Sequence, residues 1–179
     1  MRDYVKYAGI LFAITFVTAL LLGVVNNFTA PVIENFKNEK MKAAIEVVVD
    51  GNIAVATEEK HDVEGESSVQ EITSYMNDKG SKVYAVKAVP VGYAGDIEMM
   101  IGLNSDGKVT GVEIINMSET AGLGANAKGN TEWLAQFLGK GKDKLDSITG
   151  ATITSKAVQK GVNDARAQVE KIAGGVDVE

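Results

Sequence analysis

The sequence contains no cysteine and only one histidine. Without cysteine the chain can form neither a disulfide nor a thiolate nucleophile, and it cannot ligate an iron–sulfur cluster or a cysteine-based zinc ion. The histidine, His61, lies in a polar stretch and is expected to be a solvated surface residue. We expect no metal site, so redox chemistry in this chain would require a bound organic cofactor.

Positive charge is also scarce, with 18 lysines and arginines against 24 acidic residues and a net charge of −6. A nucleic-acid-binding domain needs a basic face that neutralises phosphates, so we expect no nucleic-acid partner. The length of 179 residues suits one globular domain with an anchor, and the hydrophobic fraction of 45% supports a real core.

Charge is absent altogether from Tyr7 to Val25. At about 1.5 Å per residue, a helix over this segment spans roughly 28 Å, close to the hydrocarbon thickness of a bilayer. A buried core helix and a cleavable signal peptide are the alternatives. An uncleaved transmembrane helix is favoured, because the apolar run is long for a signal peptide and no convincing cleavage site follows Val25.

The charges that flank this segment bear on its orientation. Arg2 and Lys6 precede it and favour a cytoplasmic N-terminus, whereas Lys37, Lys40 and Lys42 on the other side weaken that bias. Charge alone therefore gives only a slight preference for an external C-terminal domain.

The pattern changes after the apolar segment, which suggests an N-terminal segment 1–30 and a soluble domain 31–179. Pro31 is expected to end the membrane helix, and a second helix is predicted over Val32–Val49, closed by Asp50-Gly51. Residues 52–80 are polar, with a short helix predicted over Ser67–Asn77.

Three strands are predicted next, over Lys82–Val91, Ile97–Leu103 and Lys108–Asn116. Asn104-Ser105-Asp106-Gly107 is a strong hairpin signal, because these residues tolerate positive φ. The three strands together indicate an antiparallel meander.

Helical periodicity returns at Thr131–Leu138 and again in a last helix that ends at Gly174-Gly175. The apolar stripe of the last helix consists of Val158, Val162, Ala165, Val169 and Ile172. The predicted fold class is α+β, with an antiparallel sheet and flanking helices.

The segment from Asp146 to Ser155 carries the chemistry. It is a short glycine-containing loop that leads into the last helix, with hydroxyl side chains at Thr149, Thr152, Thr154 and Ser155. A helix N-terminus offers unpaired N–H groups and the positive end of the helix dipole, which suit a phosphate. Threonine and serine are also ordinary N-caps, so local physics alone leaves a simple helix start open.

The same segment resembles a known motif, Asp-x-x-Ser/Thr-Gly-Ala-Thr, which directs covalent flavinylation. The motif is complete here in Asp146, Thr149, Gly150, Ala151 and Thr152. It is found in the G subunit of Rnf complexes and in the C subunit of sodium-translocating NADH:quinone reductase. The resemblance implies that a transferase moves FMN from FAD onto Thr152, and the short chain favours the Rnf G subunit.

Two further segments support the resemblance. Residues 118–124 are similar to the family's Glu-Thr-Pro-Gly-Leu-Gly stretch beside the flavin, with Ala121 in place of the usual proline. The turn at Gly92-Tyr93 and Gly95 is the other, although it reads equally well as a hairpin turn. The cofactor-binding residues implied are Thr152, Thr149, Gly150, Ala151, Thr154, Glu119, Thr120, Gly122, Leu123 and Gly124.

The function implied is electron transfer through covalent FMN in an ion-translocating ferredoxin:NAD oxidoreductase complex, without an acid or base catalyst in this chain. The resemblance also implies other Rnf subunits and the flavin transferase as partners. The expected location is the inner membrane, with a cytoplasmic N-terminus and an extracytoplasmic domain. The alternatives are the quinone-reductase C subunit, a stand-alone membrane-anchored flavin carrier, and a membrane-tethered binding module without flavin.

Overall fold

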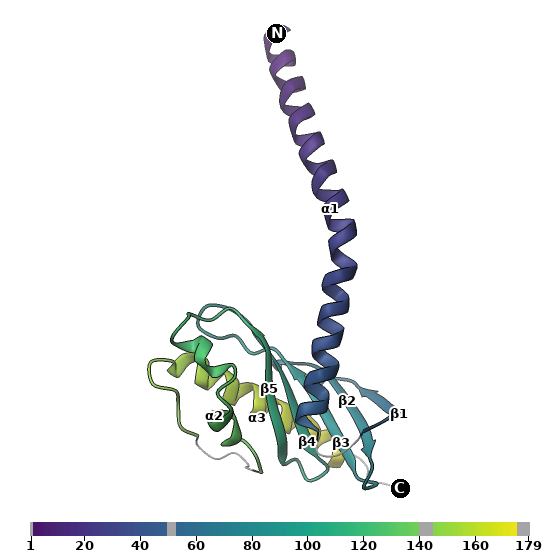
Figure 1. Cartoon of the computed structure of the whole chain (residues 1–179), viewed down its shortest axis with the longest axis vertical. Helices are drawn as coiled ribbons and strands as arrows, with labels where there is room; N and C mark the ends of the chain where they lie inside the picture. The colour runs from purple at the N-terminus through teal and green to yellow at the C-terminus, as the bar shows by residue number, and fades with distance from the viewer. Residues whose placement is uncertain (1, 50–52, 140–144, 175–179) are drawn as a thin grey trace. The chain divides into compact units, whose positions relative to one another are not determined.

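The computed structural model describes residues 2–49, 53–139 and 145–174. The chain divides into two compact units, Met1–Lys40 and Met41–Glu179. Figure 1 shows the elements in chain order, with the strands in one antiparallel sheet of order β1-β2-β3-β4-β5. The helices are α1 (Arg2–Val48), α2 (Thr131–Ala135), α3 (Thr152–Gly174) and the short 3₁₀ helix η1 (Gly124–Ala127). The strands are β1 (Ile53–His61), β2 (Val69–Asn77), β3 (Lys82–Ala88), β4 (Ile97–Asn104) and β5 (Val109–Met117). The predicted α+β class is confirmed.

Helix α1 runs for 47 residues and contains Pro31. The predicted break at Pro31 is therefore wrong, and the helix predicted from Val32 is the continuation of the first. Proline removes one N–H group and strains one turn, at about 3 kcal/mol, but long helical segments on both sides outweigh that local loss. The predicted end at Asp50-Gly51 lies outside the described residues.

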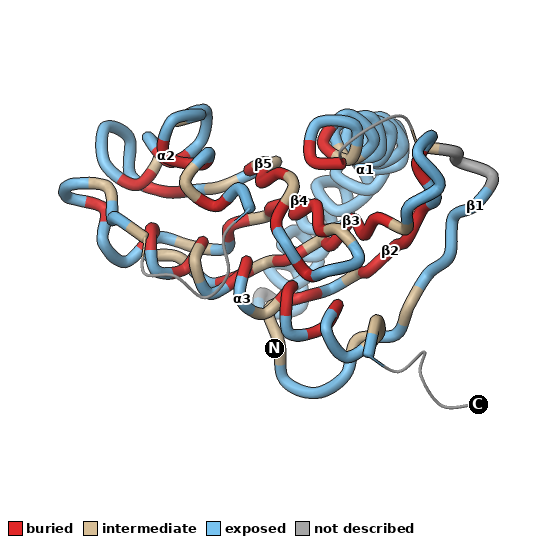
Figure 2. The backbone as a smooth tube through the Cα atoms, turned by 90° about the horizontal axis from the view of Figure 1, so that it is seen from below, coloured by how far each residue is buried: buried red, intermediate tan, exposed pale blue. Residues whose placement is uncertain are grey.

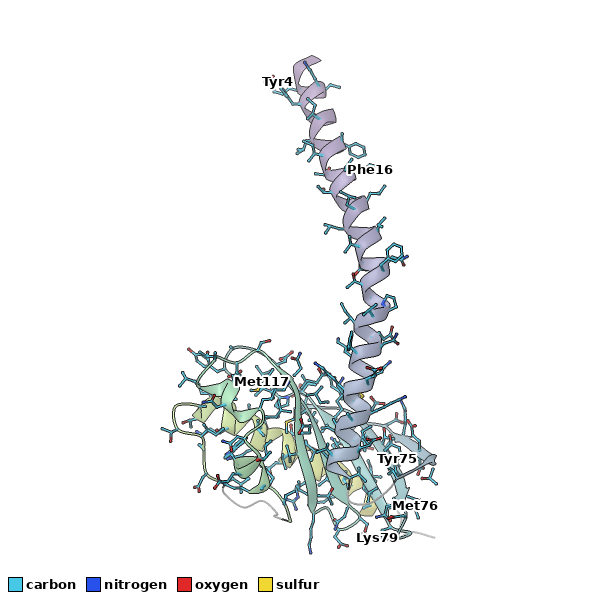
Figure 3. The ribbon with its side chains drawn as sticks, in the orientation of Figure 1. Tyr4, Phe16, Tyr75, Met76, Lys79 and Met117 are labelled. Carbon is cyan, nitrogen blue, oxygen red and sulfur yellow. The ribbon has the colours of Figure 1, made fainter. Side chains whose placement is uncertain are left out.

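The first part of α1 has the character of a membrane-spanning helix. Its side chains are exposed, as Tyr4 and Phe16 illustrate in Figure 3. The hydroxyls of Thr15 and Thr18 donate hydrogen bonds of 3.0 Å to carbonyls one turn earlier, which satisfies them without water. Among the described residues, this is the one helix long and apolar enough to cross a membrane.

The sheet has two strands, β1 and β2, that the sequence did not predict. The short helix predicted over Ser67–Asn77 is wrong, because this segment is β2 and pairs with β3 from Val69↔Ala88 to Met76↔Lys82. Valine, isoleucine, threonine and tyrosine fit a pleated, half-buried surface, which the neighbouring strands provide. β1 is an edge strand, and Figure 2 shows it largely exposed beside the buried β2, β3 and β4.

The predicted solvated position of His61 is also wrong. Its side chain is 14% exposed and lies in β1. The ring nitrogen Nε2 is 2.8 Å from the Ser74 hydroxyl, and the ring lies 6.0 Å from that of Tyr84. Pairing of β1 with β2 leaves His61 half-buried, although its polar sequence neighbours indicated an exposed position.

The three predicted strands are confirmed as β3, β4 and β5, with shifted ends. The predicted hairpin at Asn104 is confirmed as well, since Gly107 has φ of 71° and its N–H donates to the Asn104 carbonyl at 3.0 Å. The predicted helix Thr131–Leu138 is shorter, because α2 ends at Ala135 and turns follow.

Both faces of the sheet are buried. On one face α3 packs its predicted stripe, with Val158, Val162 and Val169, against β3 and β4. On the other face the last turns of α1, with Ala44 and Val48, pack against the remaining side chains of β2, β3 and β4. Alternate residues of β3 and β4 belong to opposite clusters, which explains why these strands carry apolar residues on both faces.

The end of α1 sits on a pair of glycines. Gly102 of β4 and Gly111 of β5 are register partners, and a Cβ on either would overlap the backbone of Val48. The Thr110 hydroxyl donates a 2.6 Å hydrogen bond to the Val48 carbonyl, one of the carbonyls that a helix C-terminus leaves unpaired. The glycine pair therefore fixes where the helix meets the sheet.

Replacing Gly102 with alanine should destabilise this unit, because the new methyl group cannot share the space of the Val48 carbonyl. We expect a loss of about 1–3 kcal/mol in the free energy of unfolding. Guanidinium unfolding followed by fluorescence of the single tryptophan, Trp133, measures it. Gly95→Ala is the control, since its nearest neighbour would be 3.9 Å away. Equal stability of the two variants would contradict the proposed close contact between Gly102 and Val48.

Candidate functional site

A cavity of about 410 Å³ lies where three segments meet: the turn at 92–95, the loop at 118–124 and the start of α3. Its size is within the range of small-molecule sites, about 300–1,000 Å³. The residues that line it are Tyr93, Glu119, Thr120, Leu123, Gly124, Gly150, Ala151, Thr152, Ile153 and Thr154.

The Glu119 carboxylate joins these three segments. Its Oε1 accepts hydrogen bonds from the N–H groups of Tyr93 and Ala94 at 2.9 and 3.0 Å. Its Oε2 accepts one from the Thr154 hydroxyl in the first turn of α3, at 2.6 Å. The side chain is buried, with 9% of the residue exposed. One carboxylate therefore holds the turn and the helix against the loop.

These contacts decide the charge of Glu119. Burial raises the pKa of the carboxyl, but hydrogen bonds from Thr154 and from the backbones of Ala94, Tyr93 and Gly95 lower it more, so the pKa lies below its ordinary value of 4.5. Glu119 is therefore ionised at neutral pH.

The first turn of α3 keeps its N–H groups available. The Ala151 carbonyl accepts the N–H of Ser155 at 2.9 Å, which places Ala151 at the N-cap position. Alanine has no side-chain oxygen, so it cannot cap the N–H groups of Thr152, Ile153 and Thr154. The hydroxyl of Thr152 is exposed and has no partner among the described residues. This helix start is open to an anion.

Buried polar contacts hold the loop that precedes α3. The Ser155 hydroxyl donates to the Ala151 carbonyl at 2.9 Å and accepts from the Ile148 N–H at 3.0 Å. The Trp133 indole donates to the Asp146 carbonyl at 2.7 Å. The Asp146 side chain is left exposed at the surface, where another protein can reach it.

Glycines allow the segments to approach closely. A Cβ at Gly124 would lie 2.5 Å from the Thr154 hydroxyl, and one at Gly150 would lie 3.0 Å from a methyl group of Leu123. Gly150 also has φ of 78°, a conformation that glycine adopts most easily.

The structure gathers most of the residues that the sequence singled out. Thr152, Gly150, Ala151, Thr154, Glu119, Thr120, Leu123 and Gly124 line the cavity. Thr149 and Gly122 do not line it, and Gly122 is exposed and adopts φ of 77° in the loop.

Two apolar lining residues were not assigned from the sequence. Tyr93 is 69% exposed and Ile153 is 55% exposed, beside Leu123 at 46%. Tyr93 lay in a turn that also read as an ordinary hairpin, and Ile153 lay between motif threonines. Exposure of apolar residues around one cavity could not be seen before the segments were brought together, and it suits a flat apolar ligand.

Replacing Glu119 with glutamine should weaken the fold at neutral pH by about 1–2 kcal/mol, because hydrogen bonds to a charged acceptor become neutral ones. Since the folded-state pKa is lowered, the carboxylate's contribution is present above pH 4.5 and is lost as pH falls through the folded-state value. The free energy of unfolding, measured from pH 7 to pH 3, should therefore converge for parent and variant. A difference independent of pH would contradict this.

Comparison of the sequence with known proteins identifies a domain family and several relatives. The FMN-binding domain family matches residues 92–167, which contain all three segments of the cavity. The G subunit of the Na⁺-translocating ferredoxin:NAD⁺ oxidoreductase complex of Acetobacterium woodii is 35% identical, over 88% of this chain and 87% of that protein. The G subunit of the ion-translocating oxidoreductase complex of Aliivibrio fischeri is 34% identical, over 81% of this chain and 70% of that protein. The G subunit of the proton-translocating complex of Clostridium ljungdahlii is 42% identical over 56% of this chain and 62% of that protein.

The first two relatives match across most of both chains, and the domain match coincides with the cavity. The chain therefore belongs to the G subunits of ion-translocating oxidoreductase (Rnf) complexes and contains an FMN-binding domain.

Proposed function

We propose that this chain is an electron-transfer subunit of an ion-translocating ferredoxin:NAD oxidoreductase complex and carries FMN as a phosphoester on Thr152. The observation that carries the proposal is the position of Thr152, an exposed hydroxyl in the first turn of α3 at a cavity with apolar walls.

The residues present fit the phosphate end of FMN. Thr152 supplies the oxygen for the ester, and the N–H groups of Ile153 and Thr154 point along the helix start without a side-chain cap. The positive end of the α3 dipole favours the negative charge of the phosphate. Gly150 and Ala151 leave room for close approach of an anion to the backbone.

The residues also fit the ring system. Tyr93, Leu123 and Ile153 present apolar surface around the cavity, which would cover the flat ring and exclude water from part of it. FMN supplies the redox chemistry when bound, because it accepts and releases electrons singly. This chain would hold and orient the cofactor without an acid or base catalyst of its own.

Attachment requires a second protein. Thr152 would lose its proton and bond to the phosphorus of the FMN half of FAD, and AMP would leave as the pyrophosphate bond breaks. The flavin transferase would catalyse this step, and the exposed Asp146 suits contact with it.

The apolar helix and the relatives among Rnf G subunits indicate a membrane-anchored protein. We propose that residues 7–25 cross the inner membrane with the N-terminus in the cytoplasm, and that residues 31–179 form the extracytoplasmic FMN-binding domain. The other membrane and peripheral subunits of the complex would then be its electron-transfer partners.

Replacing Thr152 with alanine should abolish covalent flavin without unfolding the protein. The hydroxyl has no partner among the described residues, so we expect the loss of stability to stay below about 1 kcal/mol. Intact mass measures the result, because the parent should exceed its sequence mass by FMN minus water when produced with the transferase.

Ser147→Ala is the matched control, since it removes an exposed hydroxyl of the same loop at an unspecified motif position. It should retain full labelling. Covalent FMN on Thr152→Ala would place the attachment elsewhere, and a parent without added mass would favour a flavin-free binding module.

The proposed topology predicts the activity of reporter fusions at the C-terminus. An alkaline phosphatase fusion should be active and a cytosolic reporter fusion inactive, because each reporter works only in its own compartment and the domain is proposed to lie outside the membrane. By the family resemblance, the transferase also works outside the membrane. Deletion of residues 7–25 should give a protein without FMN unless transferase is present in the same compartment. Covalent FMN on that truncated protein in the absence of cytosolic transferase would contradict the topology.

A further inference from the structure

We infer that the Glu119 carboxylate sets the redox equilibrium of the bound flavin, by disfavouring the negative charge that reduction adds. The inference rests on the proposed function, because it concerns a flavin held in the cavity at Thr152. It assigns to Glu119 a role as a tuning residue in addition to its part in joining the three segments.

The first step concerns which charges the cavity contains. Among the described residues that line it, Glu119 is the only carboxylate, and none of them is a lysine, arginine or histidine. The other described residues that line it carry hydroxyl, apolar or glycine groups and no carboxylate. A ligand in the cavity therefore faces one full negative charge without a lining cation to offset it.

The second step concerns the position of this charge. Glu119 is buried, and both carboxylate oxygens are engaged by donors from the turn and from α3. The side chain cannot swing into solvent without breaking these hydrogen bonds. A charge near a low-dielectric cavity wall acts more strongly than an exposed one, and salt screens it less.

The third step concerns what such a charge does to a flavin. Each electron that the flavin accepts from a donor adds one negative charge unless a proton follows. Repulsion by a fixed carboxylate makes that uptake less favourable, so the midpoint potential of the flavin falls. Thr152 and Glu119 line the same cavity, so a flavin esterified to Thr152 would stay within reach of this charge.

Glu119→Gln tests the inference on full-length protein in detergent, loaded with FMN by its transferase. Glutamine has the same shape, and its carbonyl can still accept from the Tyr93 and Ala94 backbones while its amide donates to the Thr154 oxygen. Potentiometric titration with dithionite, followed by flavin absorbance, should show a midpoint above that of the parent. We expect the ratio of reduced to oxidised FMN at a fixed potential to rise about tenfold, which is about 59 mV for a one-electron couple.

Thr154→Val separates charge from structure. It removes the 2.6 Å donor to Glu119 but keeps the branched shape and the carboxylate, which is then less neutralised. We expect its midpoint to fall or stay at the parent value. A purely structural role predicts that both variants loosen the same contact and shift the midpoint in the same direction, and that outcome would overturn the inference.

Glu113→Gln in β5 is the control for net charge, because it removes one carboxylate that does not line the cavity. Its midpoint should equal that of the parent, and a shift as large as that of Glu119→Gln would also overturn the inference. If Glu119→Gln cannot be loaded, a midpoint of Thr154→Val above the parent value contradicts the inference and one below it supports it.

Intact mass distinguishes failure of the proposed function from failure of the inference about Glu119. A parent protein without flavin contradicts the proposed function. A loaded Glu119→Gln variant with an unchanged midpoint contradicts only the inference.

Discussion

The candidate site depends on one buried carboxylate. Glu119 accepts hydrogen bonds from two consecutive N–H groups of the 92–95 turn and from a hydroxyl in the first turn of α3. These partners lie 25 to 35 residues away in sequence. No other interaction among the described residues joins all three walls of the cavity by a single side chain. Loss of the Glu119 charge would both weaken the hydrogen bonds that join the three segments and change the electrostatic potential in the cavity.

The start of α3 is arranged in a complementary way. Threonine and serine are abundant around it, yet alanine occupies the N-cap position. The hydroxyls that are buried have structural partners, since Thr154 bonds to Glu119 and Ser155 bonds to Ala151 and Ile148. Thr152 alone of these remains exposed at the cavity. Because Thr154 and Ser155 have structural partners, the Thr152 oxygen and the N–H groups of the helix start remain open to a phosphate.

The sheet positions the helix that carries the site, because helices pack on both of its faces. α3 is held on one face by its apolar stripe, and this packing fixes where its first turn lies relative to the 118–124 loop. The other face receives the end of α1 over Gly102 and Gly111, where a side chain would collide with Val48. The last turns of α1, which belong to the second unit, therefore pack directly on the sheet of that unit.

The sequence by itself determined the features that depend on local order along the chain. The Asn104 hairpin, the stripe of α3, the apolar segment of α1 and the Asp146–Thr152 motif each follow from residues within one or two turns of one another. Tertiary structure decided the rest, because the deciding contacts come from distant segments. β2 is a strand only since β1 and β3 lie beside it, and α1 continues through Pro31 because the helices on both sides outweigh one lost bond. Tyr93 and Ile153 became candidate ligand contacts, and Glu119 a fixed charge, only when folding brought three separate segments around one cavity.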